Sequence, residues 1–196
     1  MKKWVVGSER PEERFTNPEE FYNEEEAERY SKSSGMKRAQ EEIAARLIEL
    51  MGAKLPARVL DVGCGTGFSA DFLRSVGFDV RCVDRAKAMV AKARERGLDV
   101  IEGDAAELEH HFKENEFDYI ISISAMQWVR DFKKAAASLY YVLKPGGKAG
   151  VQFYPKSEQE LKSFESAFMR KFGVDITIDN PDNPRKRTIF AVLSKR

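Results

Sequence analysis

The sequence Arg58-Val59-Leu60-Asp61-Val62-Gly63-Cys64-Gly65-Thr66-Gly67 decides the fold class of this chain. Its first half is an aliphatic run typical of a buried strand, and its second half is a glycine-rich turn that leads into a helix. A second short apolar run ends at Asp84. Glycine allows the backbone to approach a ligand closely, and an acid on the next strand can accept both hydroxyls of a ribose. The pattern therefore predicts an adenosine-type cofactor.

The glycine spacing separates this turn from that of the dinucleotide-binding enzymes. It reads Gly-x-Gly-x-Gly, whereas those enzymes carry Gly-x-Gly-x-x-Gly, so the spacing argues against NAD. The motif resembles motif I of the class I S-adenosylmethionine-dependent methyltransferases, in which the turn holds the amino-acid end of the cofactor. A tight strand-to-helix turn without a ligand is the alternative interpretation. The strand before the turn and Asp84 after it favour a cofactor site.

Composition limits the class of protein. The 196 residues with 42% hydrophobic content suit a single domain with a sizeable core. The 33 basic and 32 acidic residues nearly cancel, so net charge favours neither a nucleic-acid nor a membrane partner. Cys64 and Cys82 lack zinc-type spacing, so we expect no metal site and a reducing, cytoplasmic location. No apolar stretch approaches the roughly 20 residues that span a bilayer.

Strands and helices alternate along most of the chain. We expect residues 1–35 to form an arm or lid, and residues 36–196 to form the cofactor-binding domain. An α/β, Rossmann-like class I methyltransferase fold follows, with a seven-stranded, mostly parallel sheet, one antiparallel strand, and helices on both faces. A turn at Pro145-Gly146-Gly147 precedes the fifth strand. The expected strands are 58–62, 79–84, 98–102, 117–124, 148–153, 174–178 and 188–194; the expected helices are 36–51, 68–76, 86–96, 131–143 and 157–172.

Ligands of open α/β sheets bind beyond the carboxyl ends of the strands. The turn from Gly63 to Gly65 would then face the methionine moiety, Asp61 would orient its ammonium, and Asp84 would hold the ribose. Asp104 is placed to accept a hydrogen bond from the adenine amino group. For any single acid, a helix N-cap is an equally good interpretation. The predicted cofactor-binding residues are Tyr30, Asp61, Gly63, Cys64, Gly65, Asp84, Arg85, Asp104, Ala105 and Ser122, with Met89 packed against the adenine.

The segment Ser122-Ile123-Ser124-Ala125-Met126-Gln127-Trp128 follows the fourth strand. It places the amide of Gln127 and the indole of Trp128 at the floor of the expected substrate pocket. Tyr154, at the end of the fifth strand, would supply a second aromatic wall. Aromatic faces stack on planar bases. A core position for Trp128 is the alternative.

Four segments resemble the eukaryotic small-subunit (18S) rRNA guanine-N7 methyltransferases. They are Tyr22-Asn23-Glu24-Glu25-Glu26-Ala27-Glu28-Arg29-Tyr30, Ile121-Ser122-Ile123-Ser124-Ala125-Met126-Gln127-Trp128, Gln152-Phe153-Tyr154-Pro155 and Asp179-Asn180-Pro181. The resemblance implies methyl transfer to guanine N7 of ribosomal RNA, a role in ribosome biogenesis, and a cofactor site that includes Tyr30. It also implies a small zinc-binding activator protein docked on the edge strand Leu98 to Glu102. Gly35 stands where the family pattern has arginine, and we expect a compact, archaeal-type relative.

The chemistry of guanine N7 restricts what the protein must supply. This nitrogen carries an in-plane lone pair and no proton, so we assign no general base. Arg185, Lys186 and Arg187 are candidates for phosphate contacts. Two alternatives stay open: a methyltransferase acting on small carboxylates or quinones, with residues 1–35 as its lid, and a non-catalytic ribosome-assembly scaffold.

Overall fold

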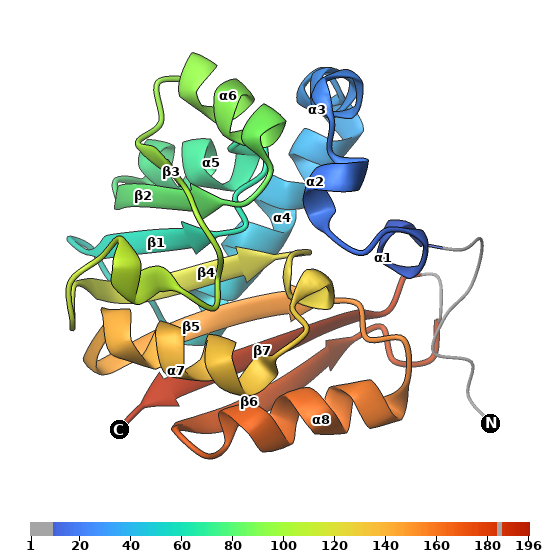
Figure 1. The fold of residues 1–196 in the computed structure, drawn as a ribbon. Coiled ribbons are helices and arrows are strands. Elements are labelled where there is room, and N and C mark those ends of the chain that lie inside the picture. The colour runs from blue at the N-terminus through green and yellow to red at the C-terminus, as the bar shows by residue number, and fades with distance from the viewer. Residues whose placement is uncertain (1–9, 184–185) are drawn as a thin grey trace.

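A seven-stranded sheet forms the centre of the molecule (Figure 1). The computed structural model describes residues 10–183 and 186–196. The sheet order is β3-β2-β1-β4-β5-β7-β6, and only β7 runs antiparallel to its neighbours. This confirms the predicted mostly parallel α/β sheet with one reversed strand. The strands are β1 (Arg58–Val62), β2 (Asp79–Asp84), β3 (Val100–Glu102), β4 (Phe117–Ile123), β5 (Leu143–Phe153), β6 (Phe172–Asp179) and β7 (Thr188–Lys195).

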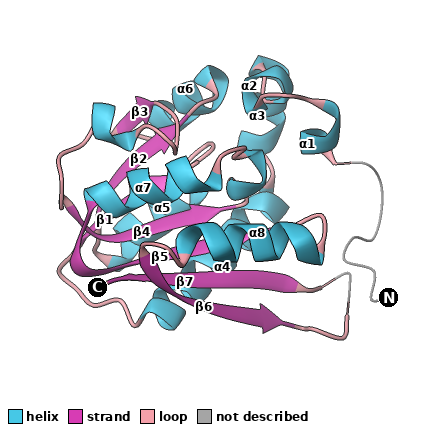
Figure 2. Cartoon of the chain, turned by 60° about the horizontal axis from the view of Figure 1, so that its bottom comes forward, coloured by secondary structure: helices cyan, strands magenta, loops and turns pink. Residues whose placement is uncertain are grey.

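Helices cover both faces of the sheet (Figure 2). Side chains of β1 alternate between the two faces, as strand geometry requires: Val59 packs with α4, α5 and α6, whereas Leu60 and Val62 pack with α7 and α8. Each face therefore has its own apolar core. The helices on the first face are α4 (Ser34–Met51), α5 (Phe68–Val76) and α6 (Lys87–Glu95); those on the second are α7 (Phe132–Val142) and α8 (Glu158–Phe168), and η1 (Leu108–His110) and η2 (Met126–Trp128) are short 3-10 turns.

Some element boundaries differ from the expected ones. The expected turn at Pro145-Gly146-Gly147 lies inside β5, which already pairs with β4 at Leu143. The pairing register shifts before it resumes at Lys148, so the tripeptide forms a bulge in the strand. The third strand is shorter than the expected 98–102, because the N–H of Leu98 still bonds to a carbonyl of α6, that of Ala93.

Three short helices form an arm before α4. They are α1 (Pro11–Arg14), α2 (Pro18–Phe21) and α3 (Glu24–Ser31). Asn23 caps α3 by accepting a bond from the N–H of Glu26 at 3.0 Å. Of the described residues of this arm, Pro18 and Ala27 alone are buried. The arm lies beyond the carboxyl ends of β1 and β4 (Figure 1), which is the edge of the sheet where ligands of this fold bind.

Within residues 10–183 and 186–196, none of the helices combines the length and the apolar character needed to cross a membrane.

Candidate active site

A cavity of about 360 Å³ lies between the arm and the carboxyl ends of the strands. Its walls come from the arm, from the turn after β1, and from the segments that follow β2, β3 and β4. The cavity therefore lies at the edge of the sheet where the sequence predicts the site. The predicted site residues that line the cavity are Tyr30, Gly63, Cys64, Gly65, Asp84, Arg85, Asp104, Ala105 and Trp128, together with Met89.

The glycine-rich turn is held against two neighbouring strands. Gly63 has a φ of +76°, and a Cβ at this position would lie 2.3 Å from the Cβ of Ala125. Any larger residue would therefore push β1 away from the segment after β4. Gly65 has a φ of +57°, and its N–H donates to Asp84 Oδ2 at 2.8 Å. The turn and the acid of the next strand are thus fixed to each other.

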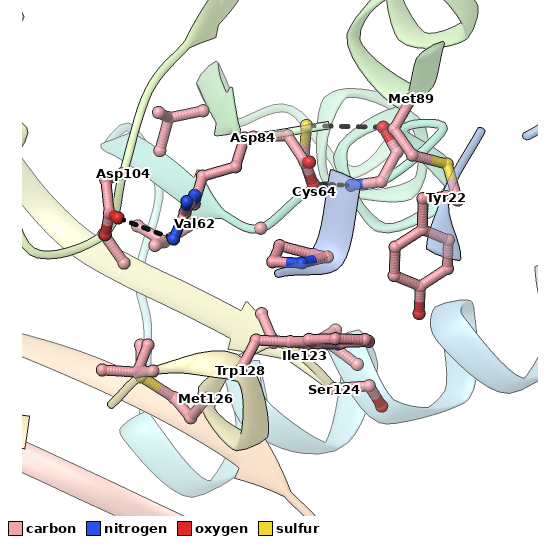
Figure 3. A pocket seen from close by; sticks show the side chains of 18 of the residues that line it. Tyr22, Val62, Cys64, Asp84, Met89, Asp104, Ile123, Ser124, Met126 and Trp128 are labelled. Carbon is pink, nitrogen blue, oxygen red and sulfur yellow. Dashed lines mark hydrogen bonds and ion pairs between the residues drawn. The ribbon is translucent and has the colours of Figure 1, made fainter. Parts of the chain in front are cut away.

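Asp84 presents a fixed carboxylate at the end of β2. Its Oδ1 accepts the N–H of Ala86 at 2.9 Å, and its Oδ2 accepts that of Gly65. Burial raises the pKa of Asp84, while these backbone donors favour the charged form. A carboxylate oxygen can accept more than one hydrogen bond, so both oxygens keep capacity for a diol. Figure 3 shows Asp84 on the opposite side of the cavity from Trp128.

Asp104 follows β3 and lies on the same side of the cavity as Asp84 (Figure 3). Its Oδ1 accepts the N–H of Ala106 at 2.8 Å, and its Oδ2 lies 3.0 Å from Arg85 Nη1. The Nε of Arg85 lies 3.0 Å from a carboxylate oxygen of Glu19 in the arm. Arg85 therefore links the cavity wall to the arm, and Asp104 acts both as a turn-stabilising acid and as an ion-pair partner.

Aromatic side chains from the arm form much of the cavity wall. The ring of Tyr30 stacks on Phe68, with centroids 6.0 Å apart, and its hydroxyl accepts from Gln40 Nε2 at 3.2 Å. The rings of Tyr22 and Trp128 lie 5.8 Å apart. Burial raises the pKa of Tyr30 to about 12 and also raises that of Tyr22. Both tyrosines are therefore neutral near pH 7.

Four predicted site residues do not line the cavity, and two of them lie in the sheet. The side chain of Asp61 is fully buried, and its Oδ2 accepts from Ser69 Oγ at 2.5 Å. Its Oδ1 is buried and has no hydrogen-bond partner among the residues that the structure describes. The Oγ of Ser122 donates to the carbonyl of Val62 at 2.8 Å. The Ser122 hydroxyl is therefore used to join β4 to β1.

Gln127 and Tyr154 are the other two. The Oε1 of Gln127 is buried, and no hydrogen-bond partner for it lies within residues 10–183 and 186–196. The side chain of Tyr154 is 41% exposed. Arg10 Nη1 donates to the carbonyl of Tyr154 at 2.5 Å. On the strand side of the cavity the wall is instead formed at Ser124, whose φ is +53° and whose Oγ donates to Gln152 Oε1 at 2.9 Å.

Sequence reasoning missed several residues of the cavity wall. Tyr22 could have been found, because it begins the first segment that resembles the methyltransferase family. Ser124 likewise stands in the second of those segments. The place of Pro18 at the cavity depends on how the arm docks, which no local pattern reports. The missed residues include Pro18, Tyr22, Met36, Gln40, Phe68, Ser124, Arg130 and Lys134.

The wall suits S-adenosylmethionine, which carries an ammonium, a ribose diol and a purine. The partnerless Oδ1 of Asp61 is a buried acceptor behind the turn. The fixed carboxylate of Asp84 matches a diol, and Met89 and Ala105 offer apolar contact for a purine. Buried polar atoms without partners are uncommon in folded proteins. The unpaired oxygen is therefore consistent with a cationic group of the cofactor.

Comparison with known proteins agrees with this site. A family model described as "Methyltransferase domain" matches residues 60–151. A solved S-adenosylmethionine-dependent methyltransferase from Methanococcus maripaludis superimposes with a TM-score of 0.74 at 17% identity, over 97% of each chain. A chain of the complex between the Haloferax volcanii Trm112 methyltransferase activator and a methyltransferase superimposes with a TM-score of 0.65 at 18% identity, over 87% of this chain and 98% of that one.

Fold and site together define a class I S-adenosylmethionine-dependent methyltransferase. The curated 18S rRNA (guanine-N(7))-methyltransferase bud23 of Schizosaccharomyces pombe is 33% identical to this chain over 197 residues. The alignment covers 92% of this chain and 73% of that relative. This chain belongs to the 18S rRNA (guanine-N(7))-methyltransferase family.

Proposed function

We propose that this protein transfers a methyl group from S-adenosylmethionine to N7 of a guanine in small-subunit ribosomal RNA, as part of ribosome biogenesis. One observation carries the proposal: a single cavity joins the Asp84 carboxylate and the glycine-rich turn to the aromatic wall at Trp128. The relationship to the curated guanine-N7 methyltransferase supports the choice of substrate. Cofactor and planar base can therefore meet in one enclosed space.

When bound, S-adenosylmethionine supplies an electrophilic methyl group on a sulfonium. The N7 lone pair of guanine forms the new N–C bond while the C–S bond breaks and its electron pair goes to sulfur. The products are a cationic 7-methylguanine and a neutral thioether, and no proton moves. The protein therefore needs to align the two reactants and exclude water, for which oriented proximity supplies roughly 7–11 kcal/mol.

The residues of this chain have separate tasks in that step. Asp84 is proposed to hold the ribose of the cofactor, and the turn from Gly63 to Gly65 is proposed to face its methionine moiety. Asp61 is proposed to orient the cofactor ammonium through its unpaired oxygen. The face of Trp128 attracts the cationic product base by about 0.5–2 kcal/mol. Residues 1–35 are proposed to act as a lid.

Ribosomal RNA is proposed to approach along the carboxyl edge of the sheet. Because β6 runs parallel to β5, the loop between β6 and β7 lies at the same edge as the cavity. Lys186 in that loop is exposed, and Arg187 donates to the carbonyl of Pro181 at 2.8 Å. Arg185, the third predicted phosphate contact, lies outside the described residues.

We also propose that a small zinc-binding activator docks on the edge strand Leu98 to Glu102. Within the described sheet, β3 is a terminal strand and pairs with β2. An unpaired strand edge invites the addition of a further strand. One chain of the Haloferax volcanii complex with the Trm112 methyltransferase activator has the same fold as this protein, which adds support. A cytoplasmic location is proposed with it, since both cysteines are free and buried.

The decisive experiment compares ribosomal RNA from cells with and without this protein. Mass spectrometry of small-subunit rRNA nucleosides should show one 7-methylguanosine lost in the deletion strain. Complementation with the wild-type gene should restore it, whereas the Asp84→Asn gene should not. An unchanged 7-methylguanosine content in the deletion strain would disprove the proposed substrate.

A further inference from the structure

Two aromatic rings from distant parts of the chain meet inside the cavity. Tyr22 lies between α2 and α3, and Trp128 ends η2 after β4. Both line the cavity, and Figure 3 shows the two rings beside its central space. Their centroids are 5.8 Å apart and their planes are inclined by 60°. Phe21 packs edge-on against Tyr22 at 4.9 Å, so the arm supports the tyrosine ring from behind.

The spacing of these rings falls slightly short of what a stacked base requires. A planar base between two rings needs about 3.5 Å on each face, hence rings about 7 Å apart and nearly parallel. The observed distance between the ring centroids, 5.8 Å, is shorter than that separation, and the angle of 60° between the ring planes is far from parallel. A movement of the arm by about 1–2 Å, with rotation of the Tyr22 ring, would open the space.

The attachment of the arm allows such a movement. Glu19 pairs with Arg85 at 3.0 Å, and both side chains are more than one third exposed. Arg130 Nη2 donates to the carbonyl of Thr16 at 2.9 Å, also at the surface. Exposed pairs of this kind contribute little to stability. The part of the arm around Thr16 and Glu19 is therefore held by surface contacts that can break and re-form. In contrast, α3 is anchored through Ala27, which packs on Ala86 and Met89.

The chemistry of the two rings suits a cationic purine. Burial raises the pKa of the Tyr22 hydroxyl, so the ring remains neutral at working pH. Neutral aromatic faces attract cations. Tyr154, the aromatic wall expected from the sequence, is 41% exposed and does not line the cavity. Arg130 does line it and is exposed to solvent, which leaves a positive charge at the cavity wall.

We propose that the target purine stacks between Tyr22 and Trp128, so that the arm supplies one face of the base-binding site. The inference rests on the proposed function, guanine-N7 methylation, and adds a residue and a moving element to it. The base enters when the arm swings outward, and the returning Tyr22 encloses it. The arm then acts as part of the substrate site as well as a cover.

Fluorescence of Trp128 provides a direct test. The sequence has two tryptophans, so a Trp4→Phe chain leaves Trp128 as its indole. Titration with 7-methylguanosine 5′-monophosphate, in the presence of S-adenosylhomocysteine, should quench this signal. Tyr22→Leu should weaken the nucleotide Kd about 5- to 100-fold, the range expected for loss of one stacking face. Tyr22→Phe keeps the ring and should bind within about twofold of the parent chain.

A control variant and methylation kinetics distinguish the loss of base stacking from damage to the fold or to the cofactor site. Tyr141→Leu removes an exposed tyrosine that does not line the cavity, and it should leave the quenching unchanged. In methylation assays, Tyr22→Leu should raise the KM for rRNA while the KM for S-adenosylmethionine stays within about twofold, and Trp128→Leu should do the same.

Two results would overturn the inference. One is absence of quenching in the Trp4→Phe chain at millimolar nucleotide. The other is a Tyr22→Leu variant that keeps the nucleotide Kd but loses affinity for S-adenosylmethionine, since Tyr22 would then serve the cofactor. Failure of the proposed function looks different: nucleotide stacking would persist while no ribosomal RNA is methylated.

Discussion

Asp84 shows how one side chain can join two elements and a ligand. Its two oxygens accept the N–H groups of Gly65 and Ala86 at 2.8 and 2.9 Å. The carboxylate therefore fixes the glycine-rich turn and the start of α6 before any cofactor arrives. A ligand that meets such a fixed acceptor loses little free energy in ordering it.

Substitution of Asp84 by asparagine tests this assignment. The amide keeps the shape but loses the charge and places an N–H₂ group opposite a backbone N–H. Hydrogen bonds to charged groups contribute about 1.5–3 kcal/mol each, so the Kd for S-adenosylmethionine should rise at least about tenfold by calorimetry. Asp79→Asn, an exposed acid on the same strand with a side chain 65% exposed, is the matched control. Equal affinities of Asp84→Asn and wild type would contradict the assignment.

The raised pKa of Asp61 leads us to expect an unusual dependence of stability on pH. Burial, with a smaller contribution from the Asp84 charge, raises its pKa from 3.8 to about 7. At a pH between these two pKa values, Asp61 keeps its proton in the folded chain and has released it in the unfolded chain. Stability should therefore fall as pH rises from about 4 to about 7, by up to roughly 4 kcal/mol for three pKa units.

Thermal unfolding of the ligand-free protein between pH 4 and pH 8 measures this effect. The Tm of wild type should decrease across the interval relative to that of Asp61→Asn, whose amide does not titrate. Asp79→Asn should follow the wild-type curve. Parallel curves for wild type and Asp61→Asn would show that Asp61 ionises near its ordinary pKa.

At the scale of elements, β3 has one side free for a partner. The N–H of Gly103 donates to the carbonyl of Asp84 in β2. Because successive N–H groups of a strand point to opposite sides, that of Glu102 faces away from β2. The neighbouring carbonyl of Val100 already accepts two bonds from Arg94, at 3.2 and 2.9 Å. The free edge of β3 is therefore centred on Glu102.

Glu102→Pro should abolish activator binding while the domain stays folded. Proline removes the outward N–H and leaves the pairing with β2 intact, as edge strands tolerate. Co-purification with the zinc-containing partner should be lost in Glu102→Pro and kept in Glu102→Ala, which retains the N–H. Binding of the partner to both variants at equal strength would exclude docking by strand addition.

Sequence reasoning succeeded where local pattern decides structure. The alternation of apolar runs and glycine turns predicted β1, α5 and β2 with their observed boundaries. It failed at Pro145-Gly146-Gly147, where pairing with β4 keeps the tripeptide inside β5 as a bulge. At the site, acids at strand ends were found because the sheet topology brings those ends together. Pro18 was missed, because its place at the cavity depends on docking of the arm.

For the whole molecule, the placement of charge supports separate roles for the arm and the rest of the carboxyl edge. The net charge is +1, yet acids outnumber bases in the described part of the arm: Glu12, Glu13, Glu19, Glu20, Glu24 to Glu26 and Glu28 stand against Arg10, Arg14, Arg29 and Lys32. An acidic segment beside a cavity that receives RNA repels phosphate. The RNA backbone should therefore approach along the rest of the carboxyl edge, away from the arm. A cofactor in contact with Tyr30 should shift the arm from its outward to its inward position.

Limited trypsin digestion can follow this balance. Bound S-adenosylmethionine would contact both Tyr30 in the arm and Asp84 in the sheet. Because it would bind the form with the arm inward, it lowers the population of the form with the arm outward by mass action. Cleavage after Arg29 and Lys32, whose side chains are 67% and 74% exposed, should slow at least about fivefold at 100-fold excess of cofactor over its Kd. Cleavage after Lys186, in the loop between β6 and β7, should keep its rate and serves as the internal control. If all three sites slowed equally, the cofactor would be stabilising the whole domain without closing the arm.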